Sequence, residues 1–276
     1  MCRHIGKDSR LSRILSSDGR GLIVPLDHGL PLGPIKGIEN LRRTLTAIIP
    51  AKPDGLLLTP GQIQACHDLL LGRDAPTVLM RVDWTNLFKP EVRSEAYVSI
   101  CKAIDALRYG ADGVVAYLFS GYEDSSVETA NIANVGKLAG ECGELGIPLV
   151  VEAMARGKLL RDHAHDLDNV LAPVRMAGEI GADLIKTDYT GDKDSFTQII
   201  EASPIPVMIA GGPRMTTPFD VFRTVSDSIE AGARGVFFGR NVFQANNPAK
   251  MVQALRAMIH EGASPEDAQL IAKQSQ

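Results

Sequence analysis

Eight short apolar segments recur along the chain, and each is followed by a turn signal and then by a longer stretch with helical periodicity. Most are continuously apolar rather than alternating, which is typical of parallel strands buried on both faces. They cover residues 21–27, 54–59, 77–83, 113–119, 148–154, 184–188, 206–210 and 235–239. Eight strand–helix units in a chain of 276 residues predict an α/β fold, a closed (β/α)8 or TIM barrel. A doubly wound sheet usually has fewer strands, and often a glycine-rich fingerprint where this chain has Pro-Leu-Asp-His-Gly.

The junctions between the predicted units carry matching turn residues. Gly110, Gly181 and Gly232 each stand where a helix ends, a position that favours a glycine in the left-handed conformation. No linker rich in Gly, Ser or Pro divides the chain, so we expect a single barrel domain over residues 1–276. Its expected parts are an N-terminal helical segment at about 1–20, the barrel at about 21–245 and closing helices at about 246–276.

The charge and the cysteine content narrow the range of partners. The net charge is -4 with no long block of one sign, so nothing indicates binding to nucleic acid or to an anionic membrane. The four cysteines lie apart without a CxxC pair, which favours reduced thiols over disulfides or a zinc site. The N-terminal segment is charged, and no run of about 18 uncharged apolar residues occurs. We therefore expect a cytoplasmic protein that acts on small molecules.

Lys186 is the most informative polar residue, because the active site of a TIM barrel lies at the carboxyl ends of its strands. It stands between apolar residues in the segment 184–188, where burying an unpaired ammonium group is costly. Desolvation beside other cations lowers the pKa of such an amine until it can attack a carbonyl. The alternative is a structural ion pair with Asp27 or Asp188. We favour the nucleophile, because a buried structural lysine on a barrel strand is uncommon.

The last two strand ends resemble the phosphate cradle that is common in barrels. One of them ends in Ala210, Gly211 and Gly212, and the other in Gly239 and Arg240. Glycines let backbone N–H groups approach phosphate oxygens, and an arginine can add a bidentate charge. Simple turn geometry for the glycines and a surface position for the arginine are the alternatives.

Other polar residues at strand ends could join Lys186. Asp27 and His28 follow the first strand, where the carboxylate could orient substrate hydroxyls or relay protons and the imidazole could equally cap a loop. Glu152 is either a second interior carboxylate or a structural partner for Lys186. Arg156 faces either a second anionic group of the substrate or the solvent.

Four motifs follow one another along the chain: PLDHG, the lysine within LIKTDYTG, IAGGP and FFGRNVFQ. Together they resemble the archaeal-type class I fructose-bisphosphate aldolase family, the DeoC- and FbaB-like aldolases, over roughly residues 21–260. The resemblance implies that Lys186 forms a Schiff base with the substrate, assisted by Asp27, without a metal or another cofactor. It also implies a homo-oligomer, often a decamer of pentamer rings. The implied phosphate site comprises Ala210, Gly211, Gly212, Gly239 and Arg240.

The chain departs from the family at the residue that transfers protons. The bisphosphate aldolases carry a tyrosine before a Pro-Arg-Gly-like sequence, and here Ala155 takes that place. Alanine cannot move a proton, so Glu152, Asp188 or Tyr189 must serve, or the reaction differs. The family's thiolase, which cleaves phosphorylated autoinducer-2, also lacks the tyrosine, although it has Lys-Thr-Tyr-Tyr where this chain has Lys-Thr-Asp-Tyr at 186–189.

The sequence therefore predicts a class I, metal-independent aldolase that cleaves or forms a carbon–carbon bond in a phosphorylated ketose or a related carbonyl compound. One alternative is a thiolase-type acyl transfer from a phosphorylated dione to coenzyme A. The other is a non-catalytic or isomerase-like barrel that binds phosphate and uses its lysine only in an ion pair. The expected catalytic residues are Lys186, Asp27, Glu152 and Asp188. Substrate binding is expected from His28, Arg156, Ala210, Gly211, Gly212, Gly239 and Arg240.

Overall fold

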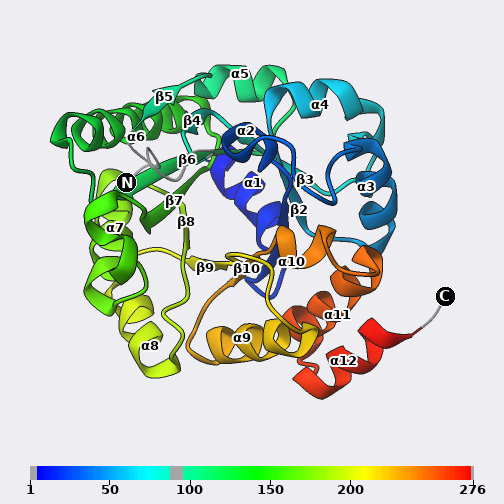
Figure 1. The fold of residues 1–276 in the computed structure, drawn as a ribbon. Coiled ribbons are helices and arrows are strands. Elements are labelled where there is room, and N and C mark those ends of the chain that lie inside the picture. Colours follow the sequence, from blue (N-terminus) through cyan, green and yellow to red (C-terminus); the bar gives the residue numbers. More distant parts are fainter. Residues whose placement is uncertain (1–4, 88–95, 275–276) are drawn as a thin grey trace.

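The computed structural model describes residues 5–87 and 96–274. Eight parallel strands close into a barrel in the order β1-β10-β9-β8-β7-β6-β3-β2 (Figure 1). They are β1 (Gly21–Pro25), β2 (Gly55–Leu58), β3 (Thr77–Arg81), β6 (Gly113–Ser120), β7 (Leu149–Ala155), β8 (Leu184–Thr187), β9 (Val207–Ala210) and β10 (Gly235–Phe237). Each barrel strand lies within a predicted apolar segment or extends one residue beyond its carboxyl end. The prediction of a TIM barrel is therefore confirmed.

Helices surround the barrel (Figure 1). The main ones are α3 (Leu41–Ile48), α4 (Pro60–Cys66), α5 (Ala103–Arg108), α6 (Ser125–Leu145), α7 (Leu167–Ile180), α8 (Lys193–Ala202), α9 (Pro218–Glu230), α11 (Pro248–Glu261) and α12 (Pro265–Lys273). Shorter helical turns are α2 (Gly29–Leu32), η1 (Ile49–Ala51), η2 (His67–Leu70), η4 (Lys158–His163) and α10 (Arg240–Phe243). The predicted closing helices are α11 and α12. Gly110, Gly181 and Gly232 have positive φ angles, as their positions at helix ends predicted.

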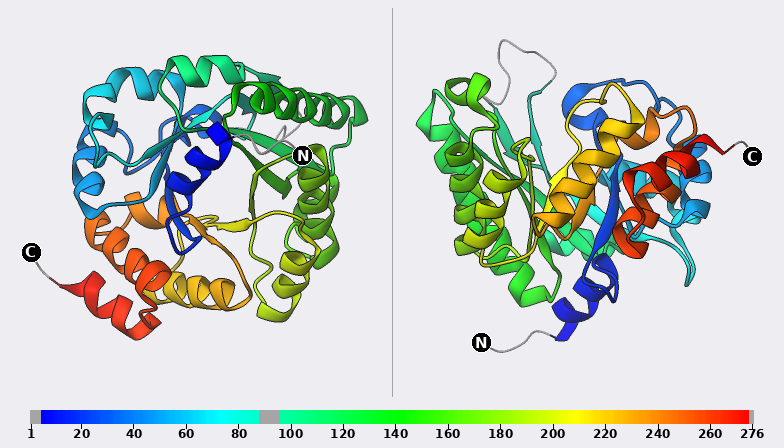
Figure 2. Two further views of the ribbon diagram at one scale, coloured as in Figure 1. Left: turned by 180° about the vertical axis from the view of Figure 1, so that it is seen from behind. Right: turned by 90° about the horizontal axis from the view of Figure 1, so that it is seen from below.

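The interior of the barrel is apolar at the end from which the strands start. The N-terminal helix α1 (Ile5–Ile14) lies across this end (Figure 2, left) and buries Ile14 completely. Ile14 belongs to a cluster to which each barrel strand contributes one residue: Ile23, Leu57, Leu79, Val115, Val150, Leu184, Met208 and Phe237. Because this layer is closed and apolar, a polar site inside the barrel can open only at the carboxyl ends of the strands.

A two-stranded antiparallel sheet of β4 (Asp83–Thr85) and β5 (Tyr97–Ser99) was not predicted. The third apolar segment was expected to continue through Asp83. In the structure the barrel strand ends at Arg81, and Asp83 pairs with Ser99 as the first residue of β4. This break matters for the site, because it places the carboxylate of Asp83 next to Arg81.

The structure also describes the state of the cysteines and the character of the helices. Cys66, Cys101 and Cys142 are free thiols, as predicted, and Cys2 lies outside the described residues. Over residues 5–87 and 96–274, no helix combines the length and the apolar character needed to cross a membrane.

Candidate active site

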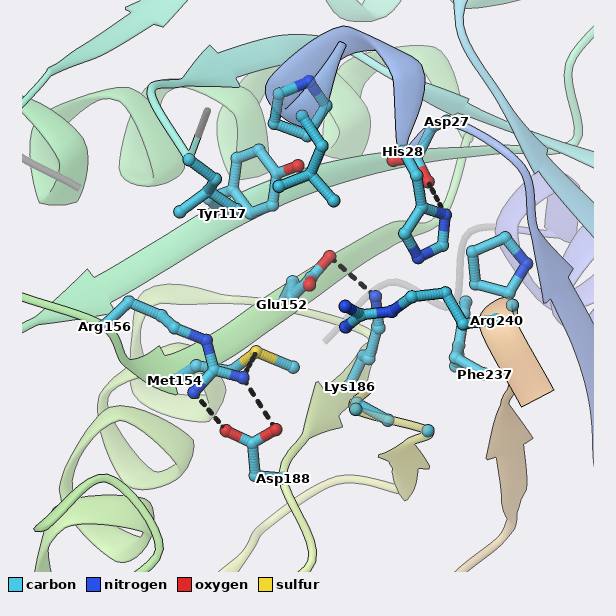
Figure 3. A pocket seen from close by; sticks show the side chains of 18 of the residues that line it. Asp27, His28, Tyr117, Glu152, Met154, Arg156, Lys186, Asp188, Phe237 and Arg240 are labelled. Carbon is cyan, nitrogen blue, oxygen red and sulfur yellow. Dashed lines mark hydrogen bonds and ion pairs between the residues drawn. The ribbon is translucent and has the colours of Figure 1, made fainter. Parts of the chain in front are cut away.

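The carboxyl ends of the barrel strands surround a cavity of about 100 Å³ (Figure 3). The strand ends and the turns after them supply its lining, because parallel barrel strands all end at the same rim. The lining includes all eleven residues that the sequence selected: Asp27, His28, Glu152, Arg156, Lys186, Asp188, Ala210, Gly211, Gly212, Gly239 and Arg240. The fold therefore brings together residues that are spread over more than 200 positions of the chain.

Glu152 and Lys186 are direct neighbours in the register of β7 and β8. Glu152 Oε2 lies 2.9 Å from Lys186 Nζ, and the two residues are only 8% and 7% exposed. The ring of Phe237 lies beside the amine, with its centroid 5.7 Å from Nζ. From the sequence, Asp27, Asp188 and Glu152 were all possible ion-pair partners of the lysine. Asp27 and Asp188 are paired with arginines, and Glu152 is the partner of Lys186, as one of those alternatives expected.

Arg81, which the sequence did not single out, also lines the cavity and contacts three carboxylates. Its Nε donates to Asp27 Oδ2 at 2.9 Å, its Nη1 to Asp83 Oδ1 at 3.4 Å and its Nη2 to Glu152 Oε2 at 2.5 Å. The guanidinium also lies 3.8 Å from the centroid of the Tyr117 ring. We call these four charged residues the Arg81 cluster. A charged residue at the end of an apolar strand is the same signal that identified Lys186, so Arg81 could have been found from the sequence.

Glu152 shares one oxygen between two cations, Lys186 and Arg81. Burial alone would raise the pKa of this carboxyl group. The attraction of Lys186 and Arg81, together with their hydrogen bonds, outweighs the effect of burial and lowers the pKa of Glu152 to about 2. Glu152 is therefore ionised at neutral pH and can receive a proton from the adjacent ammonium group only transiently.

Asp27 and His28 occupy the turn after β1, on the opposite side of the cavity from β7. Burial lowers the pKa of His28 to about 4, and the attraction of Asp27 does not offset it. The closest approach of the two side chains is 3.9 Å, between His28 Nδ1 and Asp27 Oδ1. The imidazole packs edge-on against Phe243, with the ring centroids 5.3 Å apart. At neutral pH it is thus an uncharged group that can donate or accept a hydrogen bond.

Arg156 and Asp188 form a bidentate ion pair at the rim (Figure 3). Arg156 Nη1 lies 2.5 Å from Asp188 Oδ2, and Arg156 Nη2 donates to Asp188 Oδ1 at 2.7 Å. Both residues also line an adjoining cavity of about 280 Å³, together with Arg161 and His165. Two strand ends thus contribute a charge pair that lines both the lysine cavity and the neighbouring cavity.

In the expected phosphate cradle, close packing requires glycine at Gly211 and Gly239, whereas Gly212 has no atom within 4 Å of a Cβ position and is favoured as glycine by its positive φ angle. The N–H of Gly211 donates to Phe237 O at 3.1 Å, so this N–H group is used within the barrel rather than offered to a ligand. A Cβ atom on Gly211 would lie 2.9 Å from Phe238 Cδ1. Asn241, which the sequence analysis missed, donates to Gly211 O at 2.8 Å and accepts from Met215 N at 2.8 Å. It fixes the loop after β9 against α10.

Two expectations about proton transfer change with the structure. Ala155 lines the adjoining cavity, whereas its neighbour Met154 lines the cavity around Lys186, together with Glu152 of the same strand. Neither side chain can carry a proton. Tyr189 was a candidate acid or base, but its ring packs edge-on against Phe196, with the centroids 5.2 Å apart, and it does not line the lysine cavity. Tyr117, by contrast, does line this cavity.

Comparisons with known proteins agree with this geometry. Residues 21–245 match the DeoC/LacD family aldolase. An uncharacterized aldolase of Saccharolobus solfataricus is 39% identical over 98% of this chain and 100% of its own length. The 2-amino-3,7-dideoxy-D-threo-hept-6-ulosonate synthase of Halobacterium salinarum is 34% identical over 95% of both chains. The solved Schiff base-forming fructose-1,6-bisphosphate aldolase is 25% identical, with a TM-score of 0.80 over 91% of this chain and 99% of that one. From the extent of these matches, the chain belongs to the DeoC/LacD family of aldolases, which are carbon–carbon lyases.

Proposed function

We propose that the protein is a class I aldolase in which Lys186 forms an imine with a phosphorylated ketose or a related carbonyl compound. The observation that carries this proposal is the position of the lysine. Lys186 lines the same cavity as Gly212, Gly239 and Arg240. A carbonyl carbon at Nζ would therefore have its phosphate group within the same small cavity.

The side chains present can support imine formation and carbon–carbon bond cleavage. The amine of Lys186 adds to the carbonyl carbon, and the resulting carbinolamine loses water to give an iminium ion. Glu152, at 2.9 Å, is placed to take and return the amine protons in these steps. The iminium then accepts the electron pair of the carbon–carbon bond that breaks, while the neighbouring hydroxyl group loses its proton and becomes an aldehyde. We assign this hydroxyl proton to Asp27, whose carboxylate lies across the cavity.

The relatives support a substrate of this class in both reaction directions. The name of one describes a synthase that makes a seven-carbon amino-ulosonate, and the name of the other describes cleavage of a sugar bisphosphate. Aldol addition and aldol cleavage pass through the same imine and enamine, so one site can serve either direction. We propose Gly211, Gly212, Gly239 and Arg240 as the residues that surround the phosphate group.

The direct test is reductive trapping of the imine. The protein is mixed with dihydroxyacetone phosphate or fructose 1,6-bisphosphate and treated with borohydride, and its intact mass is measured. We expect an adduct on the wild type and none on Lys186→Met, while Lys193→Met, an exposed lysine paired with Glu230, retains it. Prior treatment with EDTA should leave the adduct unchanged, because the iminium supplies the electron sink that a metal would otherwise provide. An adduct on Lys186→Met, or no adduct with any phosphorylated ketone, would contradict the proposal.

A second candidate is thiolase-type acyl transfer from a phosphorylated dione to coenzyme A. The observation that favours it is the end of β7, where Met154 and Ala155 offer no proton-transfer group beside the lysine. Release of acetyl-coenzyme A from such a dione separates the two reactions. Cleavage of the dione that does not depend on coenzyme A would exclude this candidate.

A further inference from the structure

The cavity around Lys186 has an apolar side. Tyr117 and Phe119 of β6 and Met154 of β7 line it, and their side chains belong to one buried cluster. The three residues are 4%, 2% and 3% exposed. Further apolar residues that line the cavity come from α2 and from the segment after β4, and α2 packs against β4 as β4 packs against β6. We call the whole set the apolar wall: Pro31, Leu32, Leu87, Tyr117, Phe119 and Met154.

The closed barrel places the β6 side of this wall opposite the proposed phosphate cradle. The strand order runs β10-β9-β8-β7-β6 in one direction and β10-β1-β2-β3-β6 in the other, so β6 is the fourth strand from β10 either way. Lys186 stands on β8, midway between β10 and β6. In Figure 3, Arg240 enters the cavity from the side of β10, and Tyr117 and Met154 enter it from β6 and β7. A substrate with its phosphate group beside Arg240 and its carbonyl carbon at Lys186 would therefore direct its other end toward the apolar wall.

The backbone at the end of β6 has its donors already in use. Backbone N–H groups that follow a barrel strand can hold a phosphate group. After β6, those of Gly121 and Tyr122 donate instead to Glu128 Oε2, at 3.2 and 3.4 Å. The N–H of Phe119 donates to Asn131 Oδ1 at 2.8 Å. The carboxylate of Glu128 thus occupies the place of an anion at this strand end, and it would repel a second phosphate group there.

The polar groups next to the apolar wall offer little to a hydroxylated or charged ligand. The four residues of the Arg81 cluster bind one another, and Arg156 and Asp188 form their own bidentate pair. Within the wall, Tyr117 contributes one hydroxyl group. Burial and the nearby carboxylates raise the pKa of Tyr117 well above its ordinary value, so the phenol stays protonated. The wall can therefore donate one hydrogen bond and otherwise presents hydrocarbon.

We propose that the apolar wall makes the enzyme specific for carbonyl substrates that carry a phosphate group at one end and a short hydrocarbon group at the other. A second phosphate group at that end would lie against Phe119 and Met154, losing water without gaining a donor from β6. A methyl or ethyl group would bury apolar surface there. The inference deepens the proposed function and rests on it, because the direction of the substrate follows from an imine at Lys186.

The test compares the binding of three unreactive phosphate esters by calorimetry: butyl phosphate, 4-hydroxybutyl phosphate and 1,4-butanediol bisphosphate. We expect butyl phosphate to bind to the wild type at least about tenfold more tightly than either of the others. Phe119→Tyr and Met154→Gln each place a polar atom in the wall with little change in volume. Each should reduce the preference over 4-hydroxybutyl phosphate to about threefold or less. The matched control is Leu270→Gln, which changes an exposed leucine of α12 and should keep the preference.

Every result bears on the proposal. Equal or tighter binding of either polar ester, or no measurable binding of butyl phosphate, overturns it. Tighter binding of the bisphosphate would place the far end of the substrate in the adjoining cavity, beside Arg161 and His165. A preference that stays the same in both wall variants also overturns the proposal. If Phe119→Tyr does not fold, Met154→Gln decides, because glutamine has nearly the shape of methionine.

The esters have no carbonyl group, so their binding does not depend on an imine. A wild type that prefers butyl phosphate but traps no imine at Lys186 contradicts the proposed function and leaves the binding preference of the wall in place. A wild type that traps the imine and binds the bisphosphate more tightly contradicts the specificity alone.

Discussion

His28 and Gly239 approach so closely that a Cβ atom on the glycine would fall 2.4 Å from His28 Cε1 and 2.7 Å from the carbonyl oxygen of Pro25. Only glycine fits where the end of β10 meets the turn after β1. This contact joins the first and last strands of the barrel into one surface. The imidazole and the proposed phosphate cradle consequently keep a fixed spacing.

Replacing Gly239 with alanine should weaken the binding of a phosphate ester, because His28 or the strand end must move to make room. We expect an increase of roughly 10- to 100-fold in the dissociation constant of the ester, measured by calorimetry. Gly140→Ala is the matched control, since nothing lies within 4 Å of a Cβ atom at that position of α6. Equal affinities in the two variants would show that the approach at Gly239 does not shape the site.

Replacing Glu152 with glutamine should destabilise the fold, because it leaves Arg81 and Lys186 as two buried cations without their shared anion. The expected loss in the free energy of unfolding is about 3–5 kcal/mol, measured by urea denaturation at neutral pH. Glu230→Gln, which removes an exposed partner of Lys193, should have little effect. A loss at Glu152 no larger than that at Glu230 would mean that the two cations are not held by this carboxylate.

His28 should make the fold less stable in acid. Burial lowers the pKa of the folded imidazole to about 4, below its ordinary value of 6.5, so the unfolded chain binds the proton more tightly. Above pH 6.5 the imidazole is neutral in both the folded and the unfolded chain, so it does not change the free energy of unfolding. The free energy of unfolding decreases as the pH falls from 6.5 toward 4, because the unfolded chain takes up the proton first. Over that range, the free energy of unfolding of His28→Asn should rise by about 3 kcal/mol relative to that of the wild type. If the free energies of unfolding of the wild type and His28→Asn changed in parallel with pH, His28 would not be a buried, neutral imidazole.

His260 should show the opposite dependence on pH. It lies between two carboxylates, with Nδ1 2.7 Å from Asp18 Oδ2 and Nε2 2.8 Å from Asp54 Oδ2. Burial opposes its protonation, but these hydrogen bonds outweigh burial and raise the pKa of His260 above 6.5. Its contribution is therefore complete below pH 6.5 and is lost as the pH rises through the higher, folded-state pKa.

In acid, His260→Gln should accordingly lower the free energy of unfolding by about 1–2 kcal/mol, with a smaller loss at alkaline pH. Thermal denaturation over a pH series measures the difference. His163→Gln is a suitable control, because His163 contacts Asp166 at an exposed position. If the effect of His260→Gln on stability grew with pH, it would contradict a charged His260 that bridges Asp18 and Asp54.

Much of the site could be predicted because its signals are local. The eight strands follow from continuous apolar segments, and strand ends in a parallel barrel meet at one rim whatever the details of packing. Lys186 was recognisable as a charge inside an apolar segment, and Gly211, Gly239 and Arg240 as residues beyond the last two strands. Their presence in one cavity follows from the fold class alone.

The partners of these residues could not be predicted in the same way. Asp27, Asp83 and Glu152 come from three different strands or the turns beside them, and they meet at Arg81 across the inside of the barrel. Such contacts depend on strand register, on the early end of β3 at Arg81 and on the length of the arginine side chain. None of these is visible in the sequence around any one of the four residues.

The sequence by itself therefore determined the barrel, the end at which its site opens and the lysine that defines its chemistry, because burial and strand ends are encoded over a few consecutive residues. Only the tertiary structure decided that Lys186 shares the Glu152 carboxylate with Arg81, that Asp188 pairs with Arg156, and that Met154 rather than Ala155 lines the cavity around the amine. These contacts depend on distances of a few ångströms between strands, and those distances are fixed only when all strands close into the barrel.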